Sequence, residues 1–524
     1  MATAVAASRS PLSLALLRSP LAVPPQSGPR SDHRGLSFWM NRVLEELGTL
    51  RILSGPDAVH DLRVALRRCR SLETVMEEVD PDPAWPRMRK SARRLFRGLG
   101  ACRDAQVFEH WIKELLPESS PLRAHLLSSL EAEEKQHSTA SQRAAAKFDD
   151  KQWIQFERSL RKRSRLIPAG SLAAECLVLE RFEAAKELHN RALRTEKAKP
   201  WHALRVGVKR FRYTVEAFLP EHYVAWSENL KRVQDLLGDI HDLGVFREKL
   251  ESADLGEIAE SAKACVERVE RERSARIETY RQLTLGKTSL WHEWRHNLPY
   301  GRRLEAAAEA RLRATARASD AHPRRTGQVA RLAIRIFDIL RRGKAVPSVF
   351  ADAAMRRILV AAARLHGMGT VGDRKDSPKE LRKHLLGLAV PPNWTAEEWD
   401  LMAWAVRFHR GAEPREKNGF AKLSEEQQNS VRALAGTLRV ARGLRKAGIE
   451  TTRGLRTEKS ADAFVLRVPG LLDTAESAAH LAAAKHLLEV ALGKPLILKS
   501  APLPEKKPAP TQLDFEPHQA AASG

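Results

Sequence analysis

Most of the chain alternates hydrophobic and polar residues with the period of an α-helix. Placing successive residues at about 100° around an axis gathers the hydrophobic side chains on one side in segments 60–76, 171–197, 202–218 and 328–340. The pattern therefore predicts a mainly all-α protein.

Two of these predicted helices share a sequence pattern. Both read His-x-Leu-Arg-Val-x-x-(Arg/Lys)-Arg-x-Arg, starting at His60 and at His202. Each is followed by a Leu-Gly pair and then an aspartate, Asp104 in the first copy and Asp242 in the second. The spacing from histidine to aspartate is 44 residues in the first copy and 40 in the second. This ordered recurrence indicates a duplicated helical unit.

The polar side of each copy is basic and carries no acid. We call the two stripes the basic ladders. The first consists of His60, Arg63, Arg67 and Arg70, and the second of His202, Arg205, Lys209 and Arg212. The opposite sides carry Leu62, Ala65, Leu66, Cys69 and Met76, and Leu204, Val208, Phe211, Val215 and Phe218. Four residues of helix rise about 6 Å, which suits a linear chain of anions. A solvated basic surface is the alternative interpretation, and the recurrence of the stripe argues against it.

The whole chain is strongly basic. Its 524 residues, enough for several domains, include 89 Lys and Arg against 65 Asp and Glu, a net charge of +24. Such a surplus predicts attraction to polyanions: nucleic acid, an anionic membrane surface or inorganic polyphosphate. Aromatic residues make up only 6% of the chain, which argues against an aromatic platform for stacking bases.

Cysteines and hydrophobic runs exclude further classes. Cys69, Cys102, Cys176 and Cys265 form no CxxC pair, so we expect neither a disulfide framework nor a structural zinc site. This usage is typical of a reducing compartment, and we expect a cytoplasmic protein. No run of 18 apolar residues exists, so no membrane span is expected.

At the duplicated pattern the chain resembles the CHAD family, the conserved histidine α-helical domain, over residues 36–285. The resemblance implies two four-helix bundles related by pseudo-two-fold symmetry, with a basic central groove that binds inorganic polyphosphate. The motif residues of the family map onto the two basic ladders and Tyr213. Further cations of the same region are Arg94, Arg97, Arg103 and Lys231.

The predicted polyphosphate-binding residues are therefore His60, Arg63, Arg67, Arg70, Arg94, Arg97, Arg103, His202, Arg205, Lys209, Arg212, Tyr213 and Lys231. No catalytic residue, metal ligand or cofactor is predicted. We expect Asp104 and Asp242 to orient neighbouring arginines, and the repeated Gly100 and Gly238 to end a helix or to allow a close helix approach. The two histidines either become protonated beside a polyanion or serve in packing or capping.

Residues 321–500 resemble, in the order of their helices and histidines, the helical HD-type region of the exopolyphosphatase/guanosine pentaphosphate phosphatase family. A working site of that kind holds divalent metal on His and Asp ligands. Here Gly367 follows His366 where the family pattern has Asp, and Arg442 occupies the late Asp position. Arg325 or Thr326 occupies the place of an early His. His366, His384 and His409 remain, so the resemblance implies a degenerate HD-like domain, with zinc on these three histidines as the minor alternative. The resemblance also implies a small α/β unit at the end of this domain, with strands over 464–468 and 495–499 and a helix over 474–492 between them.

The remaining segments complete the predicted domain organisation. Residues 1–35 read as a disordered or misassigned extension, with Met40 as another possible start, and a transit or weak signal peptide as the alternative. Residues 286–320 read as a linker ending in a helix, and 501–524 as a disordered tail.

The function predicted from these features is non-catalytic polyphosphate binding in the CHAD domain, linked to polyphosphate granules or phosphate storage in the cytoplasm. Two alternatives stay open. One is a metal-dependent phosphohydrolase acting on polyphosphate or a nucleotide through the HD-like domain. The other is non-specific nucleic-acid binding through phosphate contacts; in the main prediction nucleic acid is only a competitor.

Overall fold

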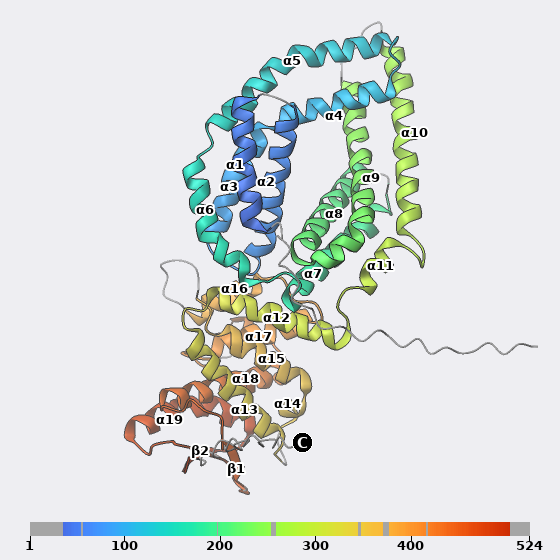
Figure 1. The fold of residues 1–524 in the computed structure, drawn as a ribbon. Helices are drawn as coiled ribbons and strands as arrows, with labels where there is room; N and C mark the ends of the chain where they lie inside the picture. The colour runs from blue at the N-terminus through green and yellow to red at the C-terminus, as the bar shows by residue number, and fades with distance from the viewer. Residues whose placement is uncertain are drawn as a thin grey trace, which may run out of the picture. The chain divides into compact units, whose positions relative to one another are not determined.

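The structure is a computed structural model that describes residues 35–53, 56–195, 197–252, 258–343, 347–369, 377–414, 418–458 and 460–503. In these residues the chain is mainly helical, which confirms the fold class predicted from the hydrophobic pattern (Figure 1). None of the described helices is long and apolar enough to cross a bilayer. Residues 1–34 of the extension predicted over 1–35, and most of the predicted tail, lie outside the described residues.

The first copy of the repeat belongs to a bundle of four helices: α1 (Leu36–Ile52), α2 (Pro56–Glu77), α3 (Ala84–Gly98) and α6 (Asp150–Arg163). The hydrophobic side predicted for α2 is buried here, with Leu62, Cys69 and Met76 at most 1% exposed. Asp149 caps α6 by accepting a hydrogen bond from the backbone N–H of Gln152. Helices α4 (Gly100–Leu115) and α5 (Pro121–Ala146) connect α3 to α6.

The second copy belongs to a bundle of α7 (Leu172–Ala192), α8 (Ala198–Phe218), α9 (Pro220–Ser252) and α10 (Ala259–Thr284). Ser171 caps α7. Helix α8 packs against α2 of the first bundle, and α9 packs against α4. The two copies of the repeat are thus brought together by direct helix contacts.

Residues 286–320, which the sequence presents as a linker, contain two packed helices. In α11 (Leu290–His296), Trp291 and Trp294 are at most 2% exposed and belong to the same hydrophobic core as Phe211 of α8. Helix α12 (Gly301–Ser319) packs against α7 and against α15 of the C-terminal region. Its Arg311 is fully buried, and its Nε lies 2.8 Å from the Glu180 carboxylate. The helix predicted at the end of this segment is present as α12, whereas α11 was not predicted, because its apolar positions were read without a partner surface.

The C-terminal region is built from α13 (Pro323–Arg341), α14 (Ser348–Ala351), α15 (Ala353–Leu365), α16 (Pro378–Leu386), α17 (Ala396–Phe408) and α18 (Glu425–Lys446) around one further core. Capping boxes begin two of them: Thr395 with Glu398 at α17, and Ser424 with Gln427 at α18. These local signals agree with the helical periodicity of the segment.

The predicted α/β unit ends the described chain. Strand β2 (Phe464–Pro469) pairs in parallel with β3 (Leu496–Ala501), and α19 (Ala475–Leu492) connects them. A short strand, β1 (Arg456–Glu458), pairs antiparallel with β2 and had no sequence signal. Helix α19 packs closely on α18, because a side chain at Gly436 would come within 2.6 Å of the Leu488 backbone nitrogen.

Candidate polyanion site

The two basic ladders meet at one cavity, which we call the central pocket. It has a volume of about 840 Å³ and is lined by residues of α2, α4, α8 and α9, with smaller contributions from α3 and α5. Seven of the thirteen predicted residues line it: His60, Arg63, Arg67, Arg103, Arg205, Lys209 and Tyr213. The duplicated pattern therefore corresponds to one shared site and not to two separate ones.

The cations of the central pocket are crowded and half-buried. Burial, together with the charge of Arg205 and Arg67, lowers the pKa of Lys209 to about 7. Burial and the neighbouring Arg67 charge lower the pKa of Arg63 to about 10. These shifts mean that the free protein holds the pocket cations at an electrostatic cost, which an anionic ligand would relieve.

Three ladder guanidinium groups that line the central pocket carry buried nitrogens without a hydrogen-bond partner among the described residues. The Nε atoms of Arg63, Arg67 and Arg205 are inaccessible to solvent and have no hydrogen-bond partner within the described part of the chain. Arg63 is nevertheless oriented, because its Nη1 donates to the Phe96 carbonyl at 3.3 Å and its guanidinium lies 4.1 Å from the Phe96 ring centroid. Arg63 and Arg205 occupy corresponding positions of the two copies, so the burial of these guanidinium groups is a shared feature of the repeat.

The other walls of the pocket are acidic, which the ladders alone did not predict. Asp104, Glu133, Asp235, Asp239 and Asp242 also line it. Asp242 lies 3.8 Å from Arg205, and Asp239 lies 3.3 Å from Arg276. Burial raises the pKa of Asp242, and the charges of Arg205 and Lys209 oppose that rise. Asp242 thus pairs with an arginine as expected, and the pocket has a basic side on α2 and α8 and acidic positions on α9.

A pair of histidines lies at the edge of the pocket. The Nδ1 atoms of His202 and His241 are 3.4 Å apart, and His241 lines the cavity. Burial and the Arg205 charge lower the pKa of His241 to about 4. Burial, with Arg103 and Arg67, also lowers the pKa of His60. His241 was missed from the sequence, although it occupies the position in the second copy that Arg103 holds in the first.

Six predicted residues do not line the central pocket: Arg70, Arg94, Arg97, His202, Arg212 and Lys231. Arg212 contacts the lining of the pocket, because it donates a hydrogen bond to Oε1 of the lining residue Gln234 at 3.1 Å. Arg94, Arg97 and Lys231 are exposed on α3 and α9. Lys249 of α9 lines the pocket and was not predicted, because it lies outside the repeated pattern.

The expectation for Gly238 was wrong. It neither ends a helix nor allows a close helix approach, because it lies inside α9 and no heavy atom comes within 4 Å of where its Cβ would be. Gly238 instead lines the central pocket. The expectation for Gly100 was also wrong, because α3 ends at Gly98, Gly100 is the first residue of α4, and the nearest atom to a Cβ there would be Arg63 Nη1 at 3.9 Å. The close approach is made by Gly98, whose Cβ would lie 2.3 Å from that of Ala144.

The histidines of the C-terminal region do not gather at one site. His366 and His409 are buried with ring centroids 5.2 Å apart, and each donates through Nδ1 to a carbonyl of its own helix, Ala363 at 2.9 Å and Val406 at 2.6 Å. Burial lowers the pKa of both. The described residues contain no group of three His, Cys, Asp or Glu side chains placed to hold a metal, so His384 does not join the other two there.

Thr326 occupies the space that an aspartate side chain would need at position 367. A Cβ at Gly367 would lie 2.0 Å from Thr326 Oγ1, so an aspartate at this position would collide with α13. Arg442 is near enough to both histidines to lower their pKa values further. The resemblance of 321–500 to an HD-type region stays a prediction from the sequence.

Comparison with known protein families finds one match, in the N-terminal part of the chain. Residues 43–251 match the sequence model of the CHAD domain. The chain contains a CHAD domain. Among solved structures, it is similar to the crystal structure of the CHAD domain from the plant Ricinus communis, with 21% identity, 47% of this chain and 88% of that chain covered, and a TM-score of 0.37. No curated protein sequence matches the chain. The CHAD match includes both ladders, and thus the basic side of the central pocket.

Proposed function

We propose that the central pocket of the CHAD domain binds inorganic polyphosphate without chemical change. The observation that carries this proposal is that cations from both copies of the repeat line one cavity, Arg63 and Arg67 from α2 and Arg205 and Lys209 from α8. Polyphosphate supplies acceptor oxygens and negative charge at every unit, so one ligand can satisfy donors on both α2 and α8. The resemblance to CHAD proteins gives the same ligand.

The charge distribution sets where the chain of phosphates would lie. Arg63 and Arg67 project from α2, and Arg205 and Lys209 from α8, whereas Asp235, Asp239 and Asp242 line the α9 wall. Like charges repel the ligand from that wall. We expect polyphosphate to follow the basic side of the pocket, with the exposed Arg94 and Arg97 attracting the parts of a long chain that leave it. Association with polyphosphate granules or phosphate storage belongs to the same proposal.

The test is a calorimetric titration of the full-length protein with polyphosphate of defined length at about 150 mM salt. Arg67→Ala combined with Lys209→Ala should abolish binding, because both cations line the pocket and, among the described residues, neither donates to a side-chain acceptor. Arg158→Ala combined with Lys162→Ala removes the same formal charge from exposed positions of α6 outside the pocket and is the matched control.

Competition with single-stranded RNA completes the experiment. A dedicated polyphosphate site resists displacement by RNA. If RNA displaces polyphosphate equally well, or if the control variant loses as much affinity as the pocket variant, binding is a general property of the basic surface and the proposal is wrong.

A further inference from the structure

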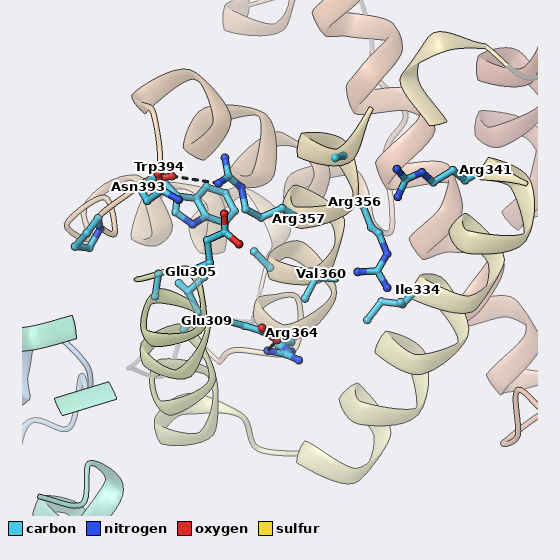
Figure 2. A pocket seen from close by; sticks show the side chains of 15 residues that line it. Glu305, Glu309, Ile334, Arg341, Arg356, Arg357, Val360, Arg364, Asn393 and Trp394 are labelled. Carbon is cyan, nitrogen blue, oxygen red and sulfur yellow. Dashed lines mark hydrogen bonds and ion pairs between the residues drawn. The ribbon is translucent and has the colours of Figure 1, made fainter. Parts of the chain in front are cut away.

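A second cavity lies in the C-terminal half of the chain, between α12, α13, α15 and the segment 392–394 (Figure 2). Its volume is about 490 Å³, within the range of small-molecule sites. Its apolar lining comes from Ala308, Leu312, Ile334, Val360 and Ala361. We call it the α12–α15 pocket, and it shares no lining residue with the central pocket.

Three arginines at the rim of this pocket are held in place by carboxylates. Arg356 donates to both oxygens of Asp338, at 2.6 and 3.0 Å. Arg364 lies 2.5 Å from Glu309, and Arg357 pairs with Glu398, the residue that completes the capping box of α17. Because these side chains are fixed before any ligand arrives, a ligand would not have to bear the entropy of ordering them.

Two further charged residues, Glu305 and Arg341, line the α12–α15 pocket. Among the described residues, neither Arg341 nor Glu305 has a hydrogen-bond or ion-pair partner, and both are exposed. Figure 2 shows them on different sides of the apolar lining, with Glu305 near Trp394 and Arg341 beyond Arg356. This arrangement suits a ligand with an anionic group at one end and a hydrogen-bond donor at the other.

The Glu305 end of the pocket also presents a flat surface. Trp394 is half-buried, and the Arg357 guanidinium lies 5.2 Å from its ring centroid. The preceding Asn393 has a φ of 66° and is the one described non-glycine residue with positive φ. Its carbonyl accepts a hydrogen bond from Arg357 Nη1 at 3.3 Å. A strained residue tied to an arginine holds this wall in one conformation.

We propose that the α12–α15 pocket binds a small heteroaromatic phosphate of the chemical class of a mononucleotide. The ring lies against the Trp394 and Arg357 surface, and its amino group donates to Glu305. The phosphate lies at Arg341 and Arg356, across the apolar lining. This site is independent of polyphosphate binding in the central pocket.

The experiment is a calorimetric titration of the full-length Arg67→Ala/Lys209→Ala variant, so that phosphate contacts in the central pocket do not contribute. The probes are AMP, ribose 5-phosphate and inorganic phosphate. AMP should bind at one site per chain, and ribose 5-phosphate at least about tenfold more weakly, because base–aromatic stacking is lost. Equal binding of AMP and ribose 5-phosphate would show a site for free phosphate only and would overturn the proposal.

Further substitutions test the two ends separately. Arg341→Ala should weaken both AMP and ribose 5-phosphate, whereas Glu305→Ala should weaken AMP alone. Arg342→Ala, at the adjacent exposed arginine that does not line the pocket, is the control and should leave AMP affinity unchanged. Absence of saturable AMP binding, or AMP binding that survives both Arg341→Ala and Glu305→Ala, refutes the site.

Discussion

Lys209 makes polyphosphate binding dependent on pH in a direction that can be derived. Its pKa in the free protein is about 7, because burial and the charges of Arg205 and Arg67 disfavour the ammonium, while Asp242 and Asp235 offset this only in part. A bound polyanion favours the ammonium and should return the pKa of this lysine toward its ordinary value of about 10.4. Binding therefore takes up a proton above pH 7, and affinity should be highest below pH 7.

The size of the effect follows from linkage. Above the pKa of the free lysine, affinity falls about tenfold for each pH unit until the pKa of the bound state is reached. Between pH 7, where half of the free protein is already protonated at this lysine, and pH 9, the loss is about fiftyfold, or about 2.3 kcal/mol. Near pH 8 the complex should take up about 0.9 proton at this site. His60 and His241 have pKa values below their ordinary one, so their own proton uptake lies at lower pH.

The assay is calorimetry in two buffers of different ionisation enthalpy, which gives affinity and proton uptake together. Lys209→Arg is the matched variant, because arginine keeps its charge over this range. It should bind polyphosphate with no loss between pH 7 and pH 9, and it also corrects for titration of the terminal phosphates. If wild type and Lys209→Arg show the same pH dependence, the reasoning about this lysine is refuted.

The free protein should respond in the opposite direction. Since the pKa of Lys209 is lower in the folded than in the unfolded state, the unfolded chain binds the extra proton between pH 7 and about pH 10. This group alone therefore makes the fold more stable as pH rises through that window. Thermal unfolding without ligand, compared between wild type and Lys209→Met, measures this contribution.

Two further predictions concern single positions. Gly238→Ala should raise the free energy of unfolding by about 0.5–1 kcal/mol, since it replaces a helical glycine in open space, whereas Gly238→Leu should weaken polyphosphate binding by filling the pocket. Gly244→Leu, also in α9 with open space but outside the pocket lining, is the control, and equal binding losses in the two leucine variants would contradict the assignment. Arg311→Met should lower the free energy of unfolding by about 3–5 kcal/mol because it leaves Glu180 buried without its partner. Denaturant unfolding should show a change of only about 0.5 kcal/mol for the exposed Arg313→Met on the same helix, and a similarly small change for Arg311→Met would mean that the ion pair contributes little.

The sequence correctly predicted those features of the fold and the site that depend on a single helix. The buried side of α2 and α8 and the inward placement of Arg63, Arg67, Arg205 and Lys209 follow from helical periodicity within a single segment. The acids of α9 were not expected in the site, because which of its sides faces α8 depends on how the helices pack. His241 could have been found by aligning the second echo with the first.

Other failures have the same origin. Gly238 was given a packing role, because a glycine in a repeat is usually explained by a nearby backbone, and only the structure shows that its neighbour is the pocket. The tryptophans of α11 were assigned to a linker, since their partner Phe211 lies eighty residues earlier in the chain. Strand β1 is only three residues long and depends on pairing with β2.

Helix α12 has a consequence for how this chain can be divided. Its Ala314 belongs to the core of the N-terminal bundles, while Leu312 and Ala316 belong to the core of the C-terminal region. A fragment that stops at residue 285 loses Trp291 and Trp294, and one that starts at residue 321 loses Leu312 and Ala316. Neither cut therefore coincides with a boundary between independent hydrophobic cores. Because α12 contributes residues to both hydrophobic cores, heating or proteolysis should unfold the two halves together in one cooperative transition.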